Sequence, residues 1–260
     1  MIHHLLSRLR SEWVLYGIVI LWILAMISVP IQRWTSGDES LRFAITLGTA
    51  LQAAAGLLIL IYSFETRKAL IIAGVVVIAA WLVEFTGSQT GFPFGAYHYT
   101  GALQPQIGGV PILIPLAWLM MLPVSWGISA ALVGGRGSIA FLTVNALVFT
   151  AWDLFLDPQM VGWGFWVWQD APAANYFGIP LTNYLGWLLA SIGITVLAMS
   201  AGMRPEKIPQ IPALVIYAAT WFLEAFGLLL FWGLPGPALV GAVAMGLPVV
   251  LTARKLYLSR

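Results

Sequence analysis

Eight long apolar stretches run through the sequence, and together they restrict the chain to one kind of fold. They cover approximately 13–31, 41–63, 69–86, 112–133, 138–157, 183–203, 212–231 and 236–253. Each is close to the roughly 20 residues that an α-helix needs to cross a bilayer. Only 8% of the residues are charged, whereas a soluble domain carries about a quarter. We therefore predict an all-α integral membrane protein, one domain over 1–260 with about eight transmembrane helices.

The basic residues predict how this bundle is oriented. Ten of the twelve lysines and arginines precede the first stretch or follow the second, fourth, sixth and eighth, which puts them on one face of the membrane. Only Arg33 and Arg42 fall on the other face. The positive-inside rule then places both termini in the cytoplasm of a multi-pass cell-membrane protein. The first stretch is about twice the length of a secretory h-region, so we expect it to be retained.

Two long connections differ from the others. Gly87–Pro111 and Pro158–Thr182 are rich in Gly, Pro and aromatic residues, and neither contains a Lys or Arg. Loops of this kind are too apolar to extend into water, so we expect them to fold back over the helices as caps. We predict that both close over one cavity on the extracytoplasmic side. Pro158 is expected to end the fifth helix.

Two similar seven-residue segments occur in the sequence. W-L-V-E-F-T-G ends at Gly87 and W-F-L-E-A-F-G ends at Gly227, which places their glutamates 140 residues apart. A parallel four-plus-four duplication would make the third and seventh helices equivalent. Matches outside these segments are poor, so coincidence is the favoured interpretation.

Four carboxyl groups lie within or at the end of apolar stretches: Glu84, Asp153, Asp157 and Glu224. A carboxylate near mid-membrane is costly and is usually kept for a function. Asp153 and Asp157 are four residues apart and share one helix face. Burial and a like-charged neighbour favour the protonated form, so this pair is a candidate general acid. Two structural interpretations stay open, a headgroup-region carboxylate for Asp157 and a hydrogen bond between helices for either glutamate.

Several classes of chemistry are excluded by residue usage. The absence of cysteine excludes disulfides, thiolate catalysis and covalent haem attachment. One histidine near the acids cannot assemble the multi-histidine boxes of membrane di-iron enzymes. No lysine lies within an apolar stretch, which excludes a retinal Schiff base of the rhodopsin kind. D-L-F-L-D is faintly similar to prenyltransferase motifs that bind diphosphate through magnesium, but basic partners are missing around it. Nothing in the charge pattern indicates nucleic-acid binding.

Four ordered segments carry a resemblance to a known family. They are E-F-T-G-S-Q-T-G-F-P-F-G-A-Y-H-Y-T from Glu84, G-V-P from Gly109, D-L-F-L-D-P from Asp153, and Y-F-G-I-P-L-T-N-Y-L-G-W from Tyr176 to Trp187. They resemble the membrane-bound carotenoid biosynthesis proteins, whose best-understood members are carotenoid 1,2-hydratases of the γ-carotene 1′-hydratase and bisanhydrobacterioruberin hydratase types. The resemblance covers 81–190 well and the remainder only in hydropathy.

The resemblance implies addition of water to the terminal double bond of an acyclic ψ-end group. An acid would protonate C2 and water would add to the tertiary cation at C1. We expect Asp153 to donate the proton, supported by Asp157 or Glu84, and Glu224 or His98 to orient the water. Tryptophan faces would stabilise the cation. The candidate substrate-binding residues are Phe94, Tyr97, His98, Tyr99, Trp118, Trp152, Trp166, Asn183 and Trp187.

The expected partners are a lipid-soluble carotenoid, water and membrane lipids, with no metal or organic cofactor. Two other function classes stay open. A transporter would use the same acids as a proton or cation relay. A prenyl-transferring or other end-group-modifying enzyme of the same pathway would depend on magnesium and an allylic diphosphate. The sequence leaves open which carotenoid is used and the oligomeric state.

Overall fold

The prediction of an eight-helix membrane protein is confirmed. The computed structural model describes residues 2–135, 137–169 and 173–259, with side chains from residue 13 onward. Eight helices in these ranges are long and apolar enough to cross a membrane. They are α1 (Ile2–Ser36), α2 (Ser40–Ser63), α3 (Thr66–Thr90), α4 (Leu113–Val133), α5 (Ile139–Gly162), α6 (Leu181–Ser200), α7 (Gln210–Leu230) and α8 (Pro235–Leu258).

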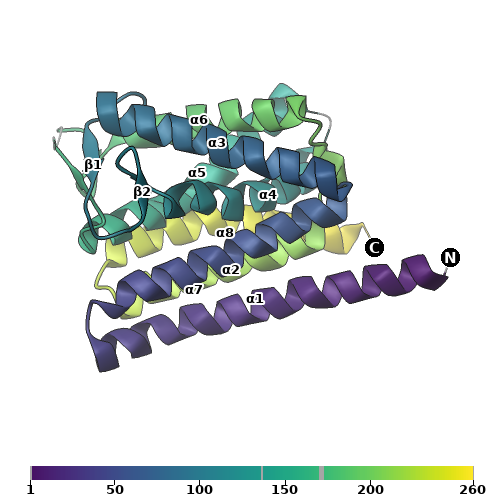
Figure 1. Cartoon of the computed structure of the whole chain (residues 1–260), viewed down its shortest axis with the longest axis horizontal. Coiled ribbons are helices and arrows are strands. Elements are labelled where there is room, and N and C mark those ends of the chain that lie inside the picture. The colour runs from purple at the N-terminus through teal and green to yellow at the C-terminus, as the bar shows by residue number, and fades with distance from the viewer. Residues whose placement is uncertain (1, 136, 170–172, 260) are drawn as a thin grey trace.

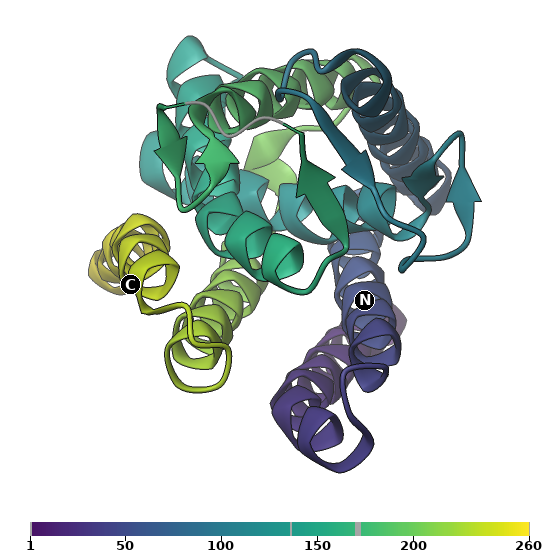
Figure 2. The same ribbon diagram turned by 90° about the vertical axis from the view of Figure 1, so that its left-hand side faces the viewer.

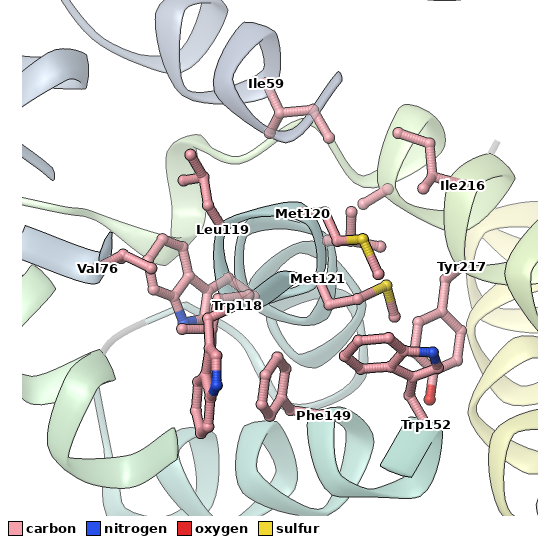
Figure 3. Close-up of a cluster of buried hydrophobic side chains, with 14 of the residues drawn as sticks. Ile59, Val76, Trp118, Leu119, Met120, Met121, Phe149, Trp152, Ile216 and Tyr217 are labelled. Carbon is pink, nitrogen blue, oxygen red and sulfur yellow. The ribbon is translucent and has the colours of Figure 1, made fainter. Parts of the chain in front are cut away.

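Helix α4 forms the centre of the bundle. It packs against α2, α3, α5, α7 and α8, whereas α1 packs mainly against α2 at the outside (Figure 1). Every residue from Trp118 to Ala131 is buried. Large side chains fill the space around α4, among them Phe149 and Trp152 of α5 and Tyr217 of α7 (Figure 3). Helices α3, α5 and α7 all run from the end that holds both termini toward the end that holds the strands (Figure 1).

The two long loops form one cap across the strand-bearing end of the bundle (Figure 2). Strand β1 (Tyr97–Tyr99) of the first loop pairs antiparallel with β4 (Trp166–Trp168) of the second, with Tyr97 opposite Trp168 and Tyr99 opposite Trp166. Each loop then forms a small hairpin before the next helix. These hairpins join β2 (Gln106–Ile107) to β3 (Val110–Pro111), and β5 (Asn175–Tyr176) to β6 (Ile179–Pro180). The two loops therefore fold back together over the helices, as expected.

The strands reveal an internal repeat of two helices and one loop. The longer four-plus-four duplication considered from the sequence stays untested. Each strand of the second loop begins 69 residues after its counterpart: β4 at Trp166 after β1 at Tyr97, β5 at Asn175 after β2 at Gln106, and β6 at Ile179 after β3 at Val110. The same interval separates Glu84 from Asp153 and Trp118 from Trp187. Trp118 and Trp187 stack on each other, with ring centroids 4.8 Å apart. Equivalent residues thus meet across an approximate two-fold axis that relates α3–α4 to α5–α6.

The prediction that Pro158 ends the fifth helix is wrong. Helix α5 continues to Gly162, so Pro158 lies inside it. A proline has no N–H to donate to the carbonyl four residues earlier, which here is Leu154. The hydroxyl of Tyr176, from the second loop, donates to that carbonyl instead (3.2 Å). Because the orphaned acceptor has a partner, the helix can run through the proline.

The described basic residues divide between the two ends as predicted. Arg33 and Arg42 are at the capped end, and the others are at the end that holds the termini: Arg67, Lys68, Arg204, Lys207, Arg254 and Lys255. Arg136 and Arg260, and the side chains of Arg8 and Arg10, lie outside the described residues. The side of the membrane that each end faces stays a prediction.

Candidate active site

A cavity of about 560 Å³ lies under the cap, between the loops and the helices. This volume is in the range of small-molecule sites. Most of its wall is apolar. Eleven of the thirteen residues predicted for the site line it: Glu84, Phe94, Tyr97, Tyr99, Trp118, Trp152, Trp166, Asp157, Asn183, Trp187 and Glu224. The structure therefore brings together three of the four membrane carboxyl groups and nearly all of the predicted aromatic residues.

Glu84 is buried on α3 and accepts hydrogen bonds from three side chains. Its Oε2 accepts from the hydroxyls of Tyr97 and Tyr99, both at 2.7 Å. Its Oε1 accepts from Trp118 Nε1 at 3.0 Å. Burial, and then the Glu84 charge, raise the pKa of Tyr97 and of Tyr99 well above the usual range, so both phenols stay protonated donors at neutral pH. Glu84 is thus an acceptor fixed by donors from β1 and α4.

Asp153 and Asp157 form a pair on α5 that shares one amide. Asn183 Nδ2 donates to Asp153 Oδ2 at 2.8 Å and also to Asp157 Oδ2. Trp166 Nε1 donates to Asp157 Oδ1 at 2.8 Å. Asp157 lines the cavity, whereas Asp153 is wholly buried behind it, and its Oδ1 accepts no hydrogen bond from any described residue. The pair therefore has fewer donors than its four oxygens could accept.

Glu224 lies on α7, on the side of the cavity next to α1 and α2. With its amide oriented to accept from Trp232 Nε1 (3.3 Å), Gln159 donates to Glu224 Oε2 (3.2 Å). Glu224 is half-buried and lines the cavity, so it also faces open space. Farther along the same wall, Gln52 donates to Thr220 Oγ1 at 3.2 Å.

Three of the lining tryptophans and the adjacent Phe149 form one aromatic cluster at the cavity wall. Trp118 and Trp187 stack at 4.8 Å, and Phe149 stacks on Trp187 at 5.4 Å. Trp152 meets Trp187 edge-on at 6.0 Å. Ring faces in this arrangement can stabilise a positive charge in the cavity without offering a nucleophile.

His98 does not belong to this site. Successive side chains of a strand point to opposite sides. Tyr97 and Tyr99 point into the cavity from β1, so His98 between them is exposed on the outer side of the cap. The expectation that His98 reaches in to orient water is corrected for this reason.

Sequence reasoning missed several cavity residues, including the two glutamines, Gln52 and Gln159. Gln159 lies on α5. It follows Pro158, at which the sequence predicts the helix to end, and a residue beyond that end is not expected to share the helix face. Trp163, Trp168 and Trp232 also line the cavity. A signal was present, because Trp168 lies two residues after Trp166 and an alternating strand would point both to one face. In the described ranges no three His, Asp or Glu side chains are grouped as metal ligands.

Comparisons with known proteins identify the family of the chain. Residues 40–248 match the model of the carotenoid biosynthesis protein family. Over 200 residues the chain is 28% identical to bisanhydrobacterioruberin hydratase of Haloarcula japonica, an alignment that covers 72% of this chain and 64% of that protein. The chain therefore matches somewhat less than two thirds of that relative's length. No solved structure matches it. We conclude that the chain belongs to the carotenoid biosynthesis protein family.

Proposed function

We propose that this protein is a carotenoid hydratase, which adds water to the terminal double bond of an acyclic end group and forms a tertiary alcohol. The observation that carries the proposal is the cavity, because it holds Asp157, Glu84 and Glu224 in one apolar, tryptophan-lined space. The similarity to bisanhydrobacterioruberin hydratase supports water addition as the reaction class.

The first step is proton transfer to carbon. The Asp153–Asp157 pair supplies the proton, because two carboxyl groups that share one amide are not both charged in an apolar interior. Asp157 lines the cavity and would touch the alkene. The donor role thus moves one helical turn, from Asp153 to Asp157, and Asp153 becomes a positioning residue behind it. Transfer of the proton to C2 uses the π electrons of the alkene and leaves a tertiary cation at C1.

The second step is capture of the cation. The faces of Trp118 and Trp187 and the Glu84 carboxylate stabilise the positive charge until water attacks C1. The attacking water releases one proton, which returns to the Asp153–Asp157 pair. The sum of the steps is one water added to one double bond. Glu224, with Gln159, is the group that we propose to hold the water.

The test is expression of the protein in a host that accumulates an acyclic or monocyclic carotenoid such as lycopene or γ-carotene. Pigment mass analysis is expected to show a product heavier by one water. Incubation of membranes that contain the protein with a preformed carotenoid in deuterated water should place one deuterium at C2. Failure to form any hydrated pigment would contradict the proposal. Proton-dependent flux in liposomes would identify a transporter instead, and magnesium-dependent use of an allylic diphosphate would identify a prenyl-transferring enzyme.

A further inference from the structure

The cavity is closed toward the cap and open toward one side of the bundle. The lining residues from the loops are either buried, as Phe94, Tyr97 and Trp166 are, or half-buried, as Tyr99 and Trp168 are. The only lining residues with large exposure among the described side chains come from two neighbouring helices, α1 and α7. They are Ile27, Ile31 and Trp34 of α1, and Phe222 and Phe226 of α7. We call these five residues the lateral opening.

The lateral opening lies within membrane-spanning segments. Ile27 to Trp34 form the last turns of α1, and Phe222 and Phe226 lie in the second half of α7. Its residues are apolar, and two of them, Trp34 and Phe226, contact Phe231 edge-on. The first charged groups occur at the capped end of the opening, where Arg33 pairs with Asp38 (2.6 Å) and lies over the Trp232 ring. Such a charged pair is suited to the headgroup level, which leaves the opening itself facing lipid tails.

We infer that the substrate enters the cavity sideways from the bilayer, between α1 and α7. One end of a polyene is held against the carboxyl groups, and the remainder of the chain extends through the lateral opening into the lipid. This inference rests on the proposed function for the identity of the ligand. It adds a rule of specificity: the protein recognises the end group inside the cavity and does not contact the opposite end.

Ile31 and Phe226 suit a blocking experiment, because the chain contains no cysteine. Ile31→Cys and Phe226→Cys each place one thiol at the opening. Ile20→Cys and Val215→Cys are matched controls, since each lies eleven residues, about three turns, earlier on the same helix face, away from the cavity. Each variant is labelled in detergent with a bulky apolar maleimide or with a small methylthio group, and is then reconstituted into liposomes.

Two signals are measured: pigment hydration, and quenching of tryptophan emission by a conjugated polyene fatty acid in the bilayer. The bulky label at Ile31→Cys or Phe226→Cys is expected to abolish hydration. It should also reduce the quenching to the level that the surface tryptophans alone produce. Both control positions should retain both signals with either label, and at the opening the methylthio label should lower the signals far less than the bulky label does. Unchanged quenching and hydration with the bulky label at the opening would overturn the inference. Loss of quenching in a protein that hydrates no pigment would support the opening while contradicting the proposed function.

Discussion

Glu84 and the Asp153–Asp157 pair are bound by different numbers of hydrogen-bond donors. Glu84 accepts from three side chains, whereas the two aspartates together accept from only Asn183 and Trp166 among the described residues. Donors favour the charged form of a carboxyl group, and a shortage of donors beside a like charge favours a shared proton. From this difference we propose that Glu84 acts as the carboxylate and the aspartate pair as the acid.

The aspartate pair gives the first prediction. Asp157→Asn is expected to lower the hydration rate by about 10²–10⁴-fold, the usual worth of a general acid, because the amide keeps the size of the side chain and one acceptor oxygen but cannot deliver the proton. Asp153→Asn should have a smaller effect, since it alters only a group behind the donor. Carotenoid product formed per amount of inserted protein is the measurement. A dead Asp153→Asn protein with an active Asp157→Asn protein would return the donor role to Asp153.

The two tyrosines give the second prediction. Tyr97→Phe and Tyr99→Phe each remove one hydrogen bond to the Glu84 carboxylate, an interaction worth about 1.5–3 kcal/mol. Each variant should therefore hydrate carotenoid roughly tenfold to a hundredfold more slowly. His98→Ala is the matched control on the same strand, and it should act at the normal rate because its side chain is outside the cavity. Equal activity in all three variants would show that Glu84 does not take part.

At the scale of single residues, the carboxyl groups and aromatic residues were predictable and their partners were not. A charged residue in an apolar run stands out in any sequence because its burial is expensive. The contacts that distinguish Glu84 from Asp157 come from β1, β4 and α6, which only the folded chain brings together. In the three-residue strand β1, either the two tyrosines or the histidine between them must face the cavity. The sequence alone did not establish which, so the exposed position of His98 could not be predicted.

Among the elements, α5 shows how a distant segment can change a local rule. Pro158 removes the partner of the Leu154 carbonyl, and Tyr176 replaces it from 22 residues farther along the chain. The replacement extends the helix by a further turn. That turn carries Gln159 into the cavity wall, so the position of a site residue depends on the tyrosine.

This arrangement gives the third prediction, for stability. Tyr176→Phe should lower the free energy of unfolding by about 1–2 kcal/mol, because it leaves a partly buried carbonyl without a donor. In a Pro158→Ala background the same change should cost less than half as much, since the alanine supplies its own N–H to the Leu154 carbonyl. Thermal unfolding in detergent of the wild type, both single variants and the double variant measures this coupling. Additive effects would show that the tyrosine does not stabilise the helix through this carbonyl.

The sequence predicted the helices more accurately than it predicted the internal repeat. The eight helices follow from the length and apolarity of their stretches. Their ends differ from the predicted ones by at most five residues, except that α1 begins at Ile2, eleven residues before the predicted start. The 69-residue repeat was missed because few of its equivalent residues are identical. It retains the positions of the acids, strands and turns instead, as at Gly109 and Gly178, which both have a positive φ at the hairpin turns. Only the paired strands make that equivalence visible.

For the whole molecule, the cap and the termini mark opposite ends, and the basic residues gather at the end with the termini. An excess of Lys and Arg stays on the cytoplasmic side during insertion. The cap would then face away from the cytoplasm, and the cavity beneath it would lie in the outer half of the bilayer. A substrate entering between α1 and α7 would come from the outer leaflet.

Orientation gives the last prediction, and the cysteine-free chain makes it direct. His98→Cys places one thiol on the exposed side of β1 at the capped end, and Ser259→Cys places one at the exposed end of α8. In intact cells, a membrane-impermeant maleimide is expected to label His98→Cys and not Ser259→Cys. Permeabilised cells should show labelling of both, which controls for reactivity. The reverse pattern would show that the protein has the opposite orientation. The cavity would then lie in the inner leaflet, with its proposed chemistry unchanged. Labelling of both variants in intact cells would mean that the two ends share one side, which an eight-helix bundle with a cap opposite its termini does not allow.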